Sequence, residues 1–108
     1  MDLDKAFEMI LHAGNSESAS LLGMEAARQY DFEEAEKNCR TAKEELLAAH
    51  QIQTELIQAE AGGEKCEMGI LMVHAQDHFT MASILKEVSQ EFLHLYREIN
   101  DLKEAVKK

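Results

Sequence analysis

Apolar residues recur at spacings of three and four along most of the chain, which is the pattern of amphipathic helices. A first stretch spans about 3–29, and a second begins at the capping residue Asp31 and ends at Gly62-Gly63. A third runs from about Glu64 to the end, on the order of 60 Å if unbroken. The short connections predict an all-α fold, an antiparallel up-down-up three-helix bundle in a single domain, residues 1–108.

The apolar face of the first stretch has an interruption made of poor helix formers, Gly14-Asn15-Ser16-Glu17-Ser18. One interpretation is a kink that exposes small groups beside a functional site. The other is close packing of small residues against a neighbouring helix. The sequence leaves both interpretations open.

The second stretch carries a heptad seam with a single polar member, made of Phe32, Ala35, Cys39, Ala42, Leu46, Ala49, Gln53 and Leu56. Because Cys39 lies in this seam, we interpret it as a small buried hydrophobe and not as a nucleophile. Cys66 is the only other cysteine, and two such cysteines make no disulfide framework. We expect both thiols to be reduced.

The third stretch has one long apolar stripe when its residues are placed at steps of 100°. The stripe contains Ile70, Leu71, Met81, Ile84, Leu85, Val88, Phe92, Leu95, Ile99 and Leu102. Opposite it lie Gln76, Lys86, Glu87, Gln90, Arg97 and Glu98. One layer of three helices leaves part of so long a stripe uncovered, which favours self-association.

Composition narrows the function classes. The chain has 108 residues, no proline and a formal net charge of -10, with 45% hydrophobic residues. Such a charge repels phosphate backbones and anionic lipid, so we expect no nucleic-acid partner, and it suits a partner with a basic face. No apolar run approaches the ~18 residues of a membrane helix, and the first residues do not resemble a secretory signal. We therefore expect a cytoplasmic protein without direct membrane insertion.

Three polar residues lie on the same face as the apolar stripe of the third stretch. His74, Asp77 and His78 are spaced by three and four, which makes them neighbours on a helix surface. A polar group there must be paired, bound to an ion or near solvent at a seam between chains. The three residues are therefore the candidate functional cluster.

Two chemistries suit this cluster. A neutral imidazole has a free lone pair and can accept a phosphoryl group, while a second imidazole one turn away orients the first or contacts the phosphate. Alternatively, His74-x-x-Asp77-His78 is similar to an inverted zinc-peptidase motif, with Asp77 as the base. That motif also needs a third ligand and a substrate cleft. Asp77 suggests a further hypothesis, in which three copies on a threefold axis hold one hard cation.

The segment Leu71-Met72-Val73-His74-Ala75-Gln76-Asp77-His78 resembles the phosphorylation-site segment of the lactose/cellobiose-type IIA proteins of the bacterial sugar phosphotransferase system. Three further segments resemble this family's irregular first helix, the start of its second helix and the end of that helix. They are Asn15-Ser16-Glu17-Ser18-Ala19, Asp31-Phe32-Glu33-Glu34-Ala35-Glu36 and Ala48-Ala49-His50-Gln51-Ile52-Gln53-Thr54-Glu55-Leu56-Ile57-Gln58. The resemblance thus covers nearly the whole chain.

The resemblance implies a phosphotransferase component with a phosphohistidine intermediate. His74 would take the phosphoryl group from phospho-HPr and pass it to a cysteine of the matching IIB component during uptake of a disaccharide. His78 would lie beside the phosphate as a helper. The family is a homotrimer of three-helix subunits, and the residue matching Asp77 binds a central magnesium ion.

We expect a sugar of the cellobiose or chitobiose type in preference to lactose. Two rival hypotheses stay open beside this one. The first is a non-enzymatic helical interaction module, whose stripe is only an oligomer core. The second is the zinc hydrolase described above.

Overall fold

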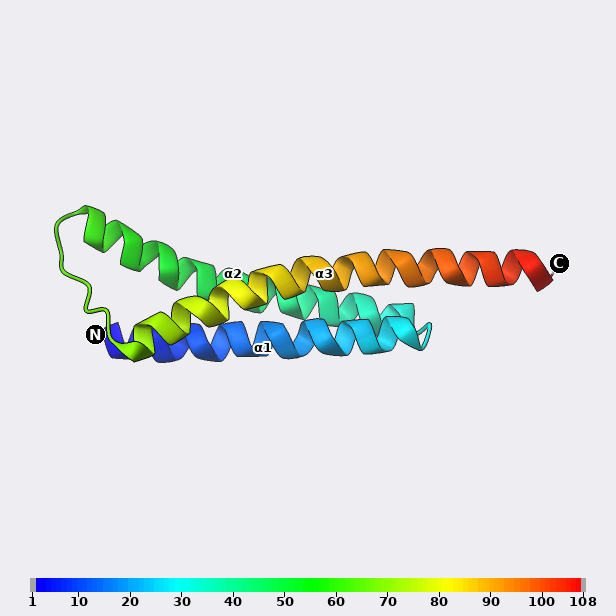
Figure 1. Ribbon diagram of the computed structural model, residues 1–108, viewed down its shortest axis with the longest axis horizontal. Coiled ribbons are helices and arrows are strands. Elements are labelled where there is room, and N and C mark those ends of the chain that lie inside the picture. Colours follow the sequence, from blue (N-terminus) through cyan, green and yellow to red (C-terminus); the bar gives the residue numbers. More distant parts are fainter. Residues whose placement is uncertain (1, 108) are drawn as a thin grey trace.

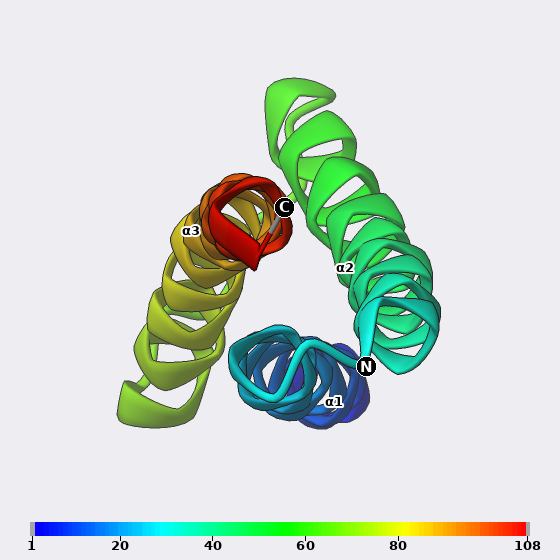
Figure 2. The same ribbon diagram turned by 90° about the vertical axis from the view of Figure 1, so that its right-hand side faces the viewer.

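The chain forms three long helices in the computed structural model, which describes residues 2–107 (Figure 1). They are α1 (Asp2–Arg28), α2 (Phe32–Ala61) and α3 (Ile70–Lys107). The helices run up, down and up, as the sequence predicts. Viewed along the bundle, they form a triangle (Figure 2). Helix α1 packs extensively against both of the others, whereas α2 and α3 touch each other over a smaller contact.

The predicted helix signals lie at the two ends of α2. The Asp31 side chain accepts a hydrogen bond from the Glu34 backbone N–H at 3.3 Å and caps α2. At the other end, Gly63 has a φ of 98°, which glycine adopts without the steric cost of a Cβ atom. The sequence therefore identified both ends of α2 correctly.

The predicted start of the third helix at Glu64 is wrong. Helix α3 begins at Ile70, and an irregular segment precedes it. Figure 1 shows this segment crossing from the splayed end of α2 to the beginning of α3, beside the start of α1. An extended residue covers about twice the distance of a helical one, so irregular chain bridges this gap where a helical turn would not. Cys66 in the segment packs against the apolar cluster that contains Met9 and Leu56.

Small side chains form the centre of the bundle. Ala13, Ala49 and Ala82, one from each helix, are fully buried against one another. Near them the buried Ser16 hydroxyl donates to the Ala42 carbonyl oxygen at 2.8 Å. Helix α1 runs unbroken through the Gly14–Ser18 interruption. Of the two interpretations, close packing of small residues against a neighbouring helix is thus confirmed at Ser16.

The apolar stripe of α3 is largely outside the bundle. The buried residues of α3 are Met72, Ala75, Ala82, Ser89 and Leu93. Large members of the predicted stripe are exposed, namely Ile70, Met81, Ile84, Val88, Phe92, Leu95 and Leu102. Figure 1 also shows α3 continuing beyond the α1–α2 turn. A single chain therefore leaves the stripe uncovered.

Gln76, predicted on the polar face opposite the stripe, instead faces the bundle. Its side-chain oxygen accepts from Gln53 Nε2 at 2.9 Å, and its own Nε2 lies 3.6 Å from the Met72 sulfur. Gln53, the polar member of the α2 seam, thereby finds its partner. One amide–amide hydrogen bond thus joins α2 and α3, which lowers the cost of placing these polar groups between helices.

Arg97 joins α3 to the start of α2 by an ion pair with Glu36. The hydrogen bond and the charge of the guanidinium lower the pKa of the Glu36 carboxyl below its ordinary value. The same guanidinium lies 5.4 Å from the centroid of the Phe32 ring. None of the helices in the described part of the chain is long and apolar enough to cross a membrane.

We predict that Ala49→Leu destabilises the protein by about 1–3 kcal/mol, because the added methylenes have no space where three helices meet. Urea unfolding followed by circular dichroism measures this loss. The matched control is Leu47→Ala two residues away, whose side chain is exposed. Equal losses for the two variants would contradict the packing described for Ala49.

Candidate functional site

His74 and His78 stand one turn apart near the start of α3. Their ring centroids are 4.5 Å apart and the ring planes are nearly perpendicular, at 86°. The Nε2 atoms of the two rings are 3.1 Å apart. His74 is exposed, whereas the His78 side chain retains only 23% of its exposure. The structure therefore brings the two predicted histidines together, with His74 as the accessible member.

Glu17 of α1 completes the group. Its Oε1 atom lies 2.7 Å from Nδ1 of His78, and 22% of its side chain is exposed. Sequence reasoning did not select Glu17 as a site residue, although it placed it in the polar interruption of the first helix. A charged residue inside an otherwise apolar face was the available signal.

The contacts fix much of the protonation pattern. A carboxylate only accepts hydrogen bonds, so Nδ1 of His78 carries a proton toward Glu17. The two Nε2 atoms also need one proton between them, because two facing lone pairs would repel. The result is a continuous chain of hydrogen bonds from Glu17 through His78 to the exposed ring of His74.

Asp77 does not join this group. It is exposed beside the apolar stripe, spaced by four and seven residues from Met81 and Ile84. Within residues 2–107, no three His, Cys, Asp or Glu side chains are placed to hold a metal ion. The zinc hypothesis requires a third ligand beside His74 and His78, and the described part of one chain does not supply it.

Two other histidines and one cysteine lie outside this group. His12 lies 2.6 Å from Glu45, so its contact is between α1 and α2 and not with α3, which carries His74. His94 is exposed. Burial raises the pKa of the Cys39 thiol, as expected for a side chain packed in a seam. These observations favour the structural interpretation of Cys39.

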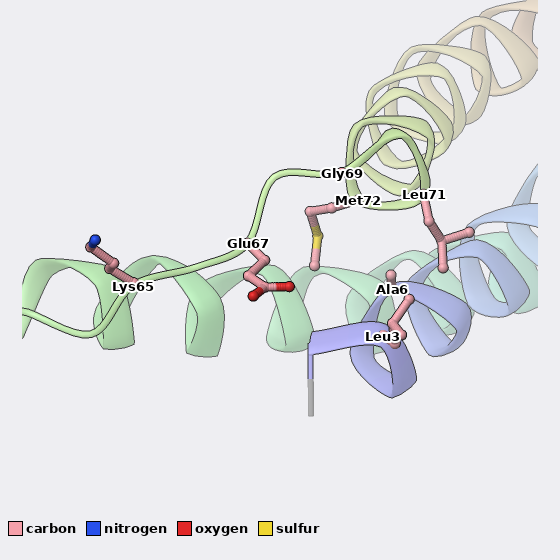
Figure 3. Close-up of a pocket in the computed structure, with 7 residues that line it drawn as sticks. All are labelled: Leu3, Ala6, Lys65, Glu67, Gly69, Leu71 and Met72. Carbon is pink, nitrogen blue, oxygen red and sulfur yellow. The ribbon is translucent and has the colours of Figure 1, made fainter.

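A pocket of about 440 Å³ opens at the end of the bundle where α3 begins. Figure 3 shows Leu3 and Ala6 of α1 beside Leu71 and Met72 of α3, with Lys65 and Glu67 on the connecting segment. His74 is not among its lining residues. The reactive pair is thus on an open helical surface and not in this pocket.

The sequence matches a family profile described as "PTS system, Lactose/Cellobiose specific IIA subunit" over residues 4–97. A lichenan-specific phosphotransferase enzyme IIA component of Bacillus subtilis is 50% identical, over 92% of this chain and 90% of the relative. A cellobiose-specific EIIA component of Lactococcus lactis is 36% identical, over 77% of this chain and 72% of the relative.

Solved structures show the same fold. The cellobiose-specific enzyme IIA of Bacillus anthracis superposes with a TM-score of 0.89 at 41% identity, covering 91% of this chain and 90% of that one. The chitobiose IIA protein of Escherichia coli, determined in complex with HPr, has a TM-score of 0.80 at 26% identity, covering 93% and 97%. The chain therefore belongs to the lactose/cellobiose-specific IIA family of the sugar phosphotransferase system.

Proposed function

We propose that this chain is a phosphocarrier that takes a phosphoryl group from phospho-HPr on His74 and passes it to a cysteine of a IIB component. The exposed His74 ring, supported from behind by His78, carries this proposal. The solved complex of the chitobiose IIA protein with HPr supports the donor. An active site of this kind makes the protein a phosphotransferase component.

The transported sugar belongs to the cellobiose or chitobiose type in this proposal, in preference to lactose. The relative with 50% identity is named for lichenan, whereas a lactose-specific EIIA component of Staphylococcus epidermidis is 35% identical. An oligo-β-mannoside-specific relative of Bacillus subtilis is also 35% identical. The identity is higher to the lichenan-specific relative than to the lactose-specific or the oligo-β-mannoside-specific relative, which favours a β-glucoside as the sugar.

The chemistry needs only a nucleophilic nitrogen and an open approach. The lone pair of a His74 ring nitrogen attacks phosphorus, the bond from phosphorus to the donor breaks, and its electron pair returns to the donor. In the second transfer a thiolate of the IIB component attacks phosphorus and the His74 nitrogen recovers its electron pair. When His78 takes up a second proton, on Nε2, that N–H is placed to donate to a phosphoryl oxygen carried by the neighbouring ring.

The net charge of -10 suits this role. An acidic surface attracts a donor with a basic active-site face and speeds the encounter, and the attraction weakens as salt is added. We place the protein in the cytoplasm, where phospho-HPr is made.

The exposed stripe of α3 supports a homotrimer with parallel helices. In its C-terminal half, Phe92, Ile99 and Val106 repeat every seven residues, with Leu95 and Leu102 between them. A threefold axis along this seam requires the three copies of α3 to run parallel.

The width of the stripe favours three chains over two. Ile84 and Leu85 are adjacent in sequence and both belong to the apolar side of α3, which makes the stripe broader than a two-stranded seam. A threefold axis along the stripe would surround each such residue with copies of itself.

Asp77 fits a magnesium ion on such an axis. It is exposed on the stripe side of α3, and within the described residues no hydrogen bond or ion pair holds its carboxylate. Carboxylate oxygens are the ligands that a hard divalent cation prefers. The ion would neutralise three carboxylates that otherwise repel one another in an apolar seam.

We predict that His74→Gln abolishes phosphate uptake from phosphoenolpyruvate, Enzyme I and HPr while helical content stays unchanged. Acid-labile phosphate, followed by mass mapping, measures the transfer, and His94→Gln is the control because His94 is exposed elsewhere on α3. Continued uptake by the His74 variant would show that the acceptor is another residue. No uptake by the wild-type chain from an active donor would favour the interaction module.

We also predict that Leu95→Asp converts the trimer to a 12.2 kDa monomer, because three buried carboxylates would face one another in the seam. Sedimentation equilibrium measures the mass. The control is His94→Asp, which adds the same side chain one position away, at an exposed residue outside the stripe. A wild-type monomer, or an intact Leu95→Asp trimer, would contradict this interface.

Removal of magnesium tests the role of Asp77. We expect EDTA to lower the melting temperature of the wild-type trimer, with magnesium restoring it. In Asp77→Asn the melting temperature should not respond to either, because the neutral amides neither repel one another nor bind the ion strongly. Differential scanning calorimetry measures both proteins. An equal response of the two would rule out Asp77 as the ligand.

A further inference from the structure

Glu17 is positioned at the site by the packing of α1. The neighbouring Ser16 is fully buried, and its hydroxyl donates to the Ala42 carbonyl oxygen of α2 at 2.8 Å. Successive residues of a helix point about 100° apart. With Ser16 directed at α2, the next side chain turns toward α3, where Oε1 of Glu17 meets Nδ1 of His78 at 2.7 Å.

The orientation of the His78 ring depends on this contact. An imidazole can rotate about its χ2 angle and exchange the positions of its two nitrogens. An acceptor at Nδ1 selects the orientation in which Nδ1–H points at Glu17 and Nε2 points at His74. The His78 side chain is 23% exposed. Without the Glu17 acceptor, water could therefore bond either ring nitrogen, and neither ring orientation would be favoured.

From these contacts we infer that Glu17 is a positioning residue for phosphoryl transfer, acting through His78 and not on the phosphate itself. The inference rests on the proposed function of His74. The nucleophile, the helper ring and an orienting carboxylate form the same three-part arrangement that activates nucleophiles in other enzymes. Here the hydrogen-bonding oxygen of residue 17 matters, because it fixes which nitrogen of His78 faces the acceptor ring.

Two substitutions separate the hydrogen bond from the charge. Glu17→Ala removes the acceptor, and Glu17→Gln retains an acceptor oxygen without the charge. We expect the Ala variant to transfer phosphate about tenfold to a hundredfold more slowly at saturating phospho-HPr, through misplacement of the helper ring. The phospho-HPr concentration that gives half the maximal rate should not change. The Gln variant should keep a rate close to that of the wild type.

The chain offers a matched control in its second interhelical His–Glu contact, between His12 and Glu45 at 2.6 Å. Glu45→Ala removes that pair without touching His74 or His78, so it reports any general effect of losing such a contact. Rapid-quench single-turnover assays give the transfer rates. Nitrogen NMR of the labelled rings gives the tautomer of His78, which should be protonated at Nδ1 in the wild type and the Gln variant, and mixed in the Ala variant.

The experiment distinguishes failure of the positioning role of Glu17 from failure of the proposed phosphocarrier function. Absence of phosphate on His74 in the wild type would remove the proposed function. With wild-type transfer intact, an unchanged rate in Glu17→Ala would overturn the positioning role alone. Equal slowing in the Ala and Gln variants, or in Glu45→Ala, would overturn it too, because charge or packing would then account for the loss.

Discussion

The rest of the structure depends on the small residues that line the contacts between the helices. Alanines and serines carry little side-chain volume, so three helices approach closely along Ala13, Ala49 and Ala82. The consequence is an inverted distribution, in which large hydrophobes of α3 such as Ile84 and Leu95 are exposed. Small residues between the helices allow close packing, and the large hydrophobic residues of α3 lie on the outer face. Both features follow from this placement of small and large side chains.

The same close approach builds the site. Because α1 lies tightly against α2 through Ser16, Glu17 is carried to His78 on α3 without a loop or a cofactor to place it. Side chains on packed helices are held more firmly than side chains on mobile segments. The bundle thus supplies, from two helices distant in sequence, a fixed support for one exposed imidazole.

Helical periodicity was sufficient to predict the three helices and the pair His74 and His78, because residues four apart on one helix must be neighbours. It did not reveal Glu17, since a contact between α1 and α3 depends on how two helices are rotated against each other. It placed Gln76 on the polar face opposite the stripe but did not show that this residue packs inside the bundle, because its partner Gln53 is on another helix. The start of α3 was missed for a related reason: the gap to α2 is a tertiary property.

A carrier that receives and donates the same group must present it to two different proteins. A deep pocket would help one partner and obstruct the other, and the pocket between α1 and the start of α3 does not contain His74. An imidazole on an open helical surface can be approached by both, provided that its orientation does not depend on either partner. The hydrogen bonds from Glu17 through His78 meet that condition from the inner side, so the outer side of His74 remains free for the proposed transfer. The closely packed bundle holds the supporting side chains in place, and the open surface keeps the reactive ring accessible. The proposed phosphotransfer requires both.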